Sequence, residues 1–233
     1  MKSEIIKRIL SSVILIPIGL FFIIKGSFIF TFFILILFII ASYEWNNMTK
    51  KKNYKIPGFI FLLISMYLTI LLRGNTDYDL YIFLCTILIC VSTDIGGYIF
   101  GNLFKGPKIN KIISPNKTYS GSMGSFFLSI VIVYIFSQNA YLISIDIEVY
   151  FGRNEFISIL LISTISQIGD FIISFFKRKS NIKNTGFIIP GHGGLLDRID
   201  GMLFALPYAS LSLYKLNYLY PSTIFKYILT HFN

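Results

Sequence analysis

Charged residues are scarce in this sequence. Asp, Glu, Lys and Arg make up 14% of the 233 residues, whereas hydrophobic residues make up 55%. Soluble domains contain about 25% charged and about 45–50% apolar residues. The composition therefore excludes an ordinary soluble domain and, even more firmly, a disordered chain. No soluble domain, linker or internal repeat is visible, so we predict a single integral membrane domain over residues 1–233.

Cysteine and histidine are also rare, with two of each. Cys85 and Cys90 lie in one apolar run, and we expect free thiols rather than a disulfide framework. So few soft ligands leave little for a site of the zinc type. The net charge of +10 would suggest nucleic acid in a soluble protein. In a chain this apolar it indicates membrane topology and an anionic substrate, and no nucleic-acid partner is expected.

Long apolar runs dominate what is present. Six are long enough, or nearly so, to cross a hydrocarbon core of about 30 Å. The first has basic residues before it, like a signal peptide, but it has no small-residue cleavage site and a second run follows at once, so we interpret it as a retained span. The fold class predicted is all-α, a polytopic membrane helix bundle of about seven transmembrane helices. Residues 1–79 supply N-terminal spans, and residues 80–233 supply the helices and loops of the candidate site. The runs are 9–24, 28–43, 56–72, 80–100, 122–141, 156–176 and a weaker one at 201–220.

The basic residues are concentrated in every second segment between the apolar runs. If the N-terminus is cytoplasmic, the cytoplasmic segments hold 16 of the 21 Lys and Arg residues. These segments are the N-terminus and the loops around Lys50, Lys108 and Lys183. The pattern satisfies the positive-inside rule, so we predict an inner (cell) membrane protein of bacterial type with a cytoplasmic N-terminus.

Two acidic residues interrupt apolar runs. Asp94 lies in ICVSTDIGGYIFG and Asp170 in STISQIGDFIISFF. A charge at the centre of a span costs at least about 2.5–3.5 kcal/mol, so it usually has a partner or a function. One interpretation is structural, either an ion pair with lysines of the adjacent loops or a protonated acid between helices. Because both acids lie at the same depth, beside two basic loops, we favour a site at the cytoplasmic face.

The first basic loop contains SPNKTYSG at 114–121. Ser114, Lys117 and Thr118 offer a point charge and hydroxyls that suit phosphate oxygens. The alternative is a solvated loop on the positive side of the membrane. Just before it, Gly97 and Gly101 have the GxxxG spacing, which tight helix packing explains as well as function does.

The second basic loop, SFFKRKSNIKNTGFIIPGHGGLLDRIDG at 174–201, is the most informative segment. Its glycines expose backbone N–H groups, and a helix starting near Leu195 would direct its N-terminus at a phosphate. Asp197 and Asp200 are spaced i, i+3 and share one face of such a helix. Carboxylates beside phosphate groups suit Mg²⁺. His192 would bind phosphate or transfer a proton, or else be a loop histidine with local hydrogen bonds.

At these residues the sequence resembles the phosphatidate cytidylyltransferase (CDP-diacylglycerol synthase) family. Two flanking segments, TDIGGYIFGNLF and SPNKTYSG, also resemble the family, as does QIGDFIISFFKR. The resemblance covers about 94–201, and in the N-terminal part only hydrophobicity agrees. The family signature has one departure, Asn184 in place of Asp. It stands here as Ser174, Phe176, Lys177, Arg178, Lys183, Asn184, Gly186, Ile189, Pro190, His192, Gly193, Gly194, Leu195, Asp197, Arg198, Ile199 and Asp200.

This resemblance implies the Mg²⁺-dependent reaction of CTP with phosphatidate to give CDP-diacylglycerol and pyrophosphate. The implied partners are CTP, phosphatidate and membrane lipids, with a homodimer as a candidate assembly. The implied metal ligands are Asp170, Asp197 and Asp200, with Asp94 a weaker candidate. The implied catalytic residues are Asp170, Lys183, His192, Asp197, Arg198 and Asp200. The implied substrate-binding residues are Ser114, Lys117, Thr118, Lys177, Arg178, Gly193 and Gly194.

Other functions remain open at the level of sequence. A CTP-dependent lipid kinase, or a cytidylyltransferase for another lipid phosphate, would keep the same class of chemistry. A secondary transporter would use embedded acids as an ion relay, but such sites lie near the midplane of the bilayer. A member of the family without activity, acting as a membrane scaffold, is the alternative raised by Asn184.

Overall fold

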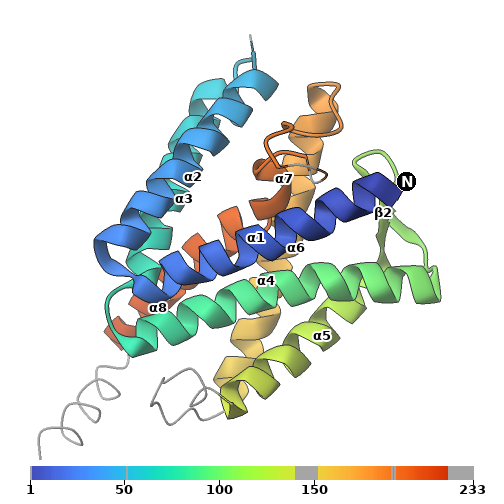
Figure 1. The fold of residues 1–233 in the computed structure, drawn as a ribbon. Helices are drawn as coiled ribbons and strands as arrows, with labels where there is room; N and C mark the ends of the chain where they lie inside the picture. Colours follow the sequence, from blue (N-terminus) through green and yellow to red (C-terminus); the bar gives the residue numbers. More distant parts are fainter. Residues whose placement is uncertain (1, 51, 140–151, 190, 192, 220–233) are drawn as a thin grey trace, which may run out of the picture.

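The computed structural model describes residues 2–50, 52–139, 152–189, 191 and 193–219, and Figure 1 shows a bundle of helices with one small hairpin of strands. The elements are α1 (Lys2–Lys25), α2 (Ser27–Met48), α3 (Lys55–Arg73), α4 (Asp77–Phe104), β1 (Lys108–Asn110), β2 (Ser114–Thr118), α5 (Tyr119–Gln138), α6 (Arg153–Lys179), α7 (Leu196–Ile199) and α8 (Met202–Leu219).

Five of these helices, α2 to α6, are long and apolar enough to cross a membrane. The helices α1 and α8 contribute shorter apolar stretches, Leu10–Lys25 and Met202–Ser212. The predicted membrane helix bundle is therefore confirmed, whereas the count of seven transmembrane helices stays a prediction.

Helices such as α2 turn a narrow stripe inward and the rest of their apolar surface outward. In α2 the buried apolar residues include Phe30, Ile34, Ala41 and Trp45, which recur at helical spacing. Between them, residues such as Ile39 are exposed, at 61% for this side chain. An outward apolar face is what hydrocarbon requires, so these helices have the pattern of lipid-embedded rather than water-exposed elements.

The helices α4 and α5 pack closely side by side (Figure 1), and glycines permit the approach. A Cβ at Gly96 would lie 2.5 Å from the carbonyl oxygen of Gly124, and one at Gly97 would lie 3.0 Å from Ser125 Oγ. Ser125 Oγ also donates to the carbonyl of Thr93 at 2.6 Å. The structure thus explains the GxxxG spacing by helix packing within the chain.

The hairpin of β1 and β2 follows α4, with Lys108 opposite Thr118 and Asn110 opposite Ser114 in antiparallel register. The sequence predicts a loop for this segment. Strands of three and five residues are too short to show a period of two. The hairpin matters for the site because it fixes Lys117 beside α6.

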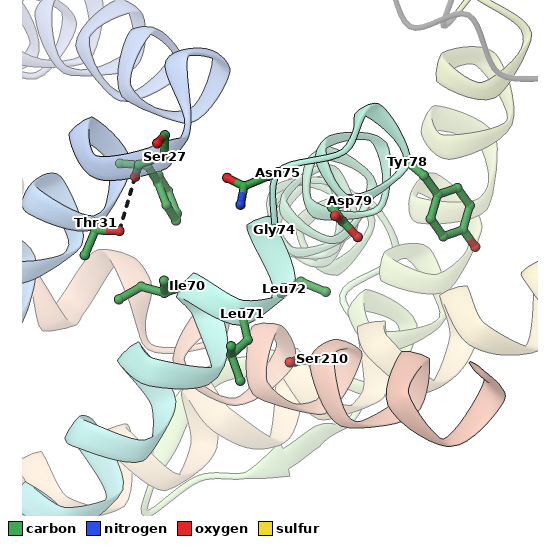
Figure 2. A pocket seen from close by; sticks show the side chains of 11 residues that line it. Ser27, Thr31, Ile70, Leu71, Leu72, Gly74, Asn75, Tyr78, Asp79 and Ser210 are labelled. Atoms are coloured by element: carbon green, nitrogen blue, oxygen red, sulfur yellow. Dashed lines mark hydrogen bonds between the residues drawn. The ribbon is translucent and has the colours of Figure 1, made fainter. Parts of the chain in front are cut away.

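A cavity of about 550 Å³ lies between the start of α2, the end of α3 and the start of α4 (Figure 2). Its lining includes Thr31, Asn75 and Asp79, and Ser210 of α8. None of its lining residues belongs to the candidate site predicted from the sequence.

Candidate active site

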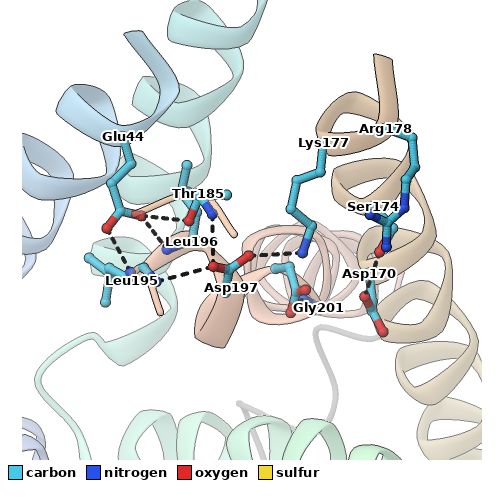
Figure 3. A network of polar contacts seen from close by, with 12 residues as sticks. Glu44, Asp170, Ser174, Lys177, Arg178, Thr185, Leu195, Leu196, Asp197 and Gly201 are labelled. Carbon is cyan, nitrogen blue, oxygen red and sulfur yellow. Dashed lines mark hydrogen bonds and ion pairs between the residues drawn. The ribbon is translucent and has the colours of Figure 1, made fainter. Parts of the chain in front are cut away.

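The segment after α6 folds back between α2 and α6, and two carboxylates hold it (Figure 3). The first is Asp197 of α7, whose side chain is 9% exposed. Its Oδ1 accepts from Lys177 Nζ at 2.8 Å, and its Oδ2 accepts from the backbone N–H groups of Thr185 at 2.9 Å and Gly194 at 3.1 Å. Asp197 thus joins the end of α6 to both ends of the loop.

The second carboxylate is Glu44, near the end of α2. Its Oε1 accepts from the N–H of Leu195 at 2.8 Å. Its Oε2 accepts from the N–H of Leu196 and from Thr185 Oγ1, both at 2.9 Å. Sequence analysis missed this residue, although the signal was available. Like Asp94 and Asp170, an acid at the end of a long apolar run usually has a partner or a function.

These contacts change the role expected for the start of α7. The helix predicted near Leu195 begins at Leu196. The sequence predicts that the N–H groups at this helix start face a phosphate. In the structure, those of Gly194, Leu195 and Leu196 donate to protein carboxylates. Gly194 is required for space, because a Cβ there would lie 2.1 Å from Thr185 Oγ1. Gly193 has a φ of +90°, a conformation that favours glycine.

Asp170 of α6 forms an ion pair with Lys117 of β2, with Nζ and Oδ2 2.5 Å apart. Lys117 Nζ lies 4.2 Å from the centre of the Phe171 ring and donates to the carbonyl of Gln167 at 3.4 Å. Ser174 Oγ donates to Asp170 Oδ1 at 3.4 Å. The pairing of an embedded acid with a lysine of an adjacent loop, one interpretation of the sequence, is therefore present at Asp170.

Asp200 is a buried carboxylate, 9% exposed, between α7 and α8. Its Oδ1 accepts from the N–H of Gly201 at 3.0 Å. Burial raises the pKa of the Asp200 carboxyl well above its ordinary value of 3.8, and the negative charges of Asp170 and Asp94 raise it further, while Lys177 opposes them. Three acids from different elements thus act on one another at this point.

Excess negative charge of this kind suits a divalent cation. Within the described ranges, no group of three or more His, Cys, Asp and Glu side chains has an arrangement ready to hold a metal ion. The negative charges that act on Asp200 are those of Asp170, which is paired with Lys117, and of Asp94, which is exposed on α4. Both oxygens of Asp197 accept hydrogen bonds from the protein, as do both oxygens of Asp170.

The other residues predicted for the site lie around the contacts made by Asp197 and Asp170. Thr118 Oγ1 accepts from the N–H of Gly121 at 3.0 Å and caps α5, whereas Ser114 begins β2. Arg178 Nε donates to the carbonyl of Ile113 at 3.4 Å, which links α6 to the hairpin. Lys183 and Arg198 are exposed. The prediction for His192 lies outside the described residues.

The fold and these networks define a class of protein: a membrane-embedded helix bundle with acidic and basic side chains gathered at one end of α2 and α6. Comparison with known sequences identifies the class further. A model of the cytidylyltransferase family matches residues 6–78 and 58–216. The chain belongs to the cytidylyltransferase family and is therefore a nucleotidyltransferase.

Relatives with curated names agree. The phosphatidate cytidylyltransferase of Rickettsia typhi is 35% identical over 210 residues, which cover 88% of this chain and 90% of the relative. That of Rickettsia prowazekii is 35% identical over 211 residues, covering 88% and 90%. That of Staphylococcus saprophyticus is 34% identical over 187 residues, covering 77% and 67%.

Proposed function

We propose that this protein transfers the cytidylyl group of CTP to phosphatidate, which gives CDP-diacylglycerol and pyrophosphate. The observation that carries the proposal is that the described residues of the signature segment, 174–201, bring acidic and basic side chains together at one end of an apolar helix bundle. Relatives named for this reaction match nearly the whole chain. A lipid substrate and a soluble nucleotide must meet at such a boundary between apolar and polar surfaces.

The chemistry demands little covalent participation from the protein. A phosphate oxygen of phosphatidate attacks the α-phosphorus of CTP, and pyrophosphate leaves. Such transfers depend on positioning and on neutralising charge. Lys117 and Lys177 already lie beside the acidic residues, and Arg178 lies on the last turn of the same helix as Lys177. With Lys183 and Arg198 they supply the positive charge that would hold the phosphates.

The cofactor we propose is Mg²⁺, held by Asp170 and Asp200, with Asp94 contributing. The support is that burial raises the pKa of the Asp200 carboxyl and that the neighbouring negative charges of Asp170 and Asp94 raise it further. When bound, Mg²⁺ would neutralise charge on the phosphates. For Asp197, the role of metal ligand stays a prediction, because its oxygens accept from Lys177, Thr185 and Gly194.

The proposed orientation places the N-terminus and this site at the cytoplasmic face of a bacterial-type inner membrane. The distribution of basic residues supports it, since Lys50, Lys108 and Lys183 all lie in segments that would be cytoplasmic. A homodimer stays a prediction.

The deciding experiment uses purified full-length protein in detergent micelles with phosphatidate and CTP labelled in the cytosine ring. We expect a chloroform-soluble cytidine product that requires phosphatidate, and the Asp200→Ala variant should form none. Diacylglycerol with γ-labelled CTP tests for a lipid kinase in parallel. Transfer of label to diacylglycerol, or the lack of any product from the wild-type protein, would refute the proposal.

A further inference from the structure

Glu44 is an acidic side chain outside the signature segment, and the proposed reaction gives it no role. It lies near the end of α2, a helix of mainly apolar residues, and its side chain is 1% exposed. A carboxylate buried this deeply is costly unless its oxygens accept hydrogen bonds. Both of its oxygens do so, which indicates a specific task for the charge.

All three donors to Glu44 belong to the signature segment (Figure 3). Leu195 and Leu196 present backbone N–H groups at the start of α7, where such groups have no partner within the helix. Thr185 approaches from the beginning of the loop through its hydroxyl. One carboxylate therefore ties together two points of the loop that are ten residues apart in sequence.

Two glycines of the same segment leave room for this carboxylate. A Cβ at Gly186 would lie 2.7 Å from Glu44 Oε1, and a Cβ at Gly194 would lie 2.6 Å from Glu44 Oε2. Contacts under 3.0 Å force a neighbour to move. The segment therefore accommodates Glu44 through its glycines as well as through its hydrogen bonds.

The connection continues from Glu44 to the reacting groups. Thr185, bound to Glu44 through its hydroxyl, also donates its N–H to Asp197, which is paired with Lys177. The first turn of α7, held by Glu44, leads directly to Asp200.

Resting on the function proposed above, we infer that Glu44 is a positioning residue that fixes the loop and α7 so that Lys177 and Asp200 face the substrates. It acts through the loop and not by touching CTP or phosphatidate.

Replacement of Glu44 by Gln is the sharpest perturbation, because shape is kept and charge is lost. If the amide nitrogen replaces Oε1, it faces the N–H of Leu195. If it replaces Oε2, it faces the N–H of Leu196, although the hydroxyl of Thr185 can reverse and accept. Either orientation leaves one backbone N–H group without an acceptor, so the loop should shift. A displacement of about 1 Å in a catalytic group can lower the rate about 100-fold.

The test compares wild-type protein, Glu44→Gln and Glu44→Ala in the labelled-CTP assay. Glu155→Gln is the matched control, because Glu155 is exposed and accepts from the N–H of Gly152 at the start of α6. We expect kcat to fall about 10–100-fold in Glu44→Gln, and further in Glu44→Ala, with KM for both substrates changed less than about threefold. The control should keep kcat within about twofold of wild type.

A second variant measures the same contact from the other side. Gly186→Ala should lower kcat, and it should do so less in the Glu44→Ala background, where the added methyl group has room. Limited trypsin treatment, with cleavage sites identified by mass spectrometry, reports directly on the loop. Cleavage after the exposed Lys183 should be faster in Glu44→Gln than in wild type.

Several results would overturn the inference. An unchanged kcat in Glu44→Gln would do so, as would an effect confined to KM for one substrate, which would show direct contact. A loss of activity that matches a loss of folded protein would make the role merely structural. If the wild-type protein forms no product, the proposed function fails by itself, and the trypsin comparison decides whether Glu44 anchors the loop.

Discussion

Replacing Asp200 by Asn should stabilise the protein in the absence of divalent cations while abolishing turnover. The Asp200 side chain is buried, and burial together with the negative charges of Asp170 and Asp94 raises the pKa of its carboxyl well above 3.8. In the ionised form it is therefore an unfavourable charge when no cation compensates for it. Asn keeps an oxygen that can accept from the N–H of Gly201, now 3.0 Å from Oδ1, and it removes the charge.

The magnitude follows from the burial of one uncompensated polar group. Removing such an uncompensated group should raise the free energy of unfolding by about 1–2 kcal/mol. In a chain of this size, 1 kcal/mol corresponds to about 2–4 °C in Tm. We therefore expect the thermal midpoint in EDTA at neutral pH to rise by about 2–8 °C in Asp200→Asn. Asp77→Asn is the control, because Asp77 is exposed at the start of α4.

The dependence on pH has a defined sign. Because the pKa of Asp200 is higher in the folded than in the unfolded protein, the folded state keeps a proton that the unfolded chain releases. The free energy of unfolding that this bound proton contributes should therefore be lost as pH rises from 3.8 through the raised pKa of Asp200. Thermal midpoints measured across this range in EDTA should fall in wild type and fall less in Asp200→Asn. A variant that is less stable than wild type, with the same pH profile, would refute this account.

Other variants test the remaining assignments. Asp197→Asn should lower activity at least about 100-fold, because it removes the negative charge that pairs with Lys177 and that the predicted metal site requires; activity close to wild type would contradict both roles. Lys117→Ala should raise KM for one anionic substrate more than it lowers kcat, and an equal fall in kcat and kcat/KM would contradict this. Asn184→Asp should reduce the Mg²⁺ concentration needed for half-maximal rate, and loss of activity would show that the site has adapted to the neutral side chain. In sealed cells, external thiol reagents should label a cysteine placed at position 77 and not one placed at position 114; labelling at 114 would overturn the orientation.

The long apolar helices could be predicted from the pattern of apolar runs alone. The apolar runs at 28–43 and 80–100 lie within the observed α2 and α4. The reason is that a backbone in hydrocarbon must satisfy its own hydrogen bonds, and a single segment can do so only as a helix. The embedded acid Asp170 and the basic loops around it also predict a site at one end of the bundle, and the ion pair of Asp170 with Lys117 lies there.

The partners of the acidic residues, in contrast, depend on how distant segments pack together. The spacing i, i+3 predicts one helix face for Asp197 and Asp200 but not their partners. Asp197 accepts from Lys177 and two loop N–H groups, and Asp200 is buried, with the negative charge of Asp170 acting on it. The hairpin of β1 and β2, which brings Lys117 to α6, has strands too short to show an alternating pattern in the sequence. Hydrogen bonds of this kind join positions as distant as Glu44 and Leu196, and only the packing of α2 against the loop brings them within 2.9 Å.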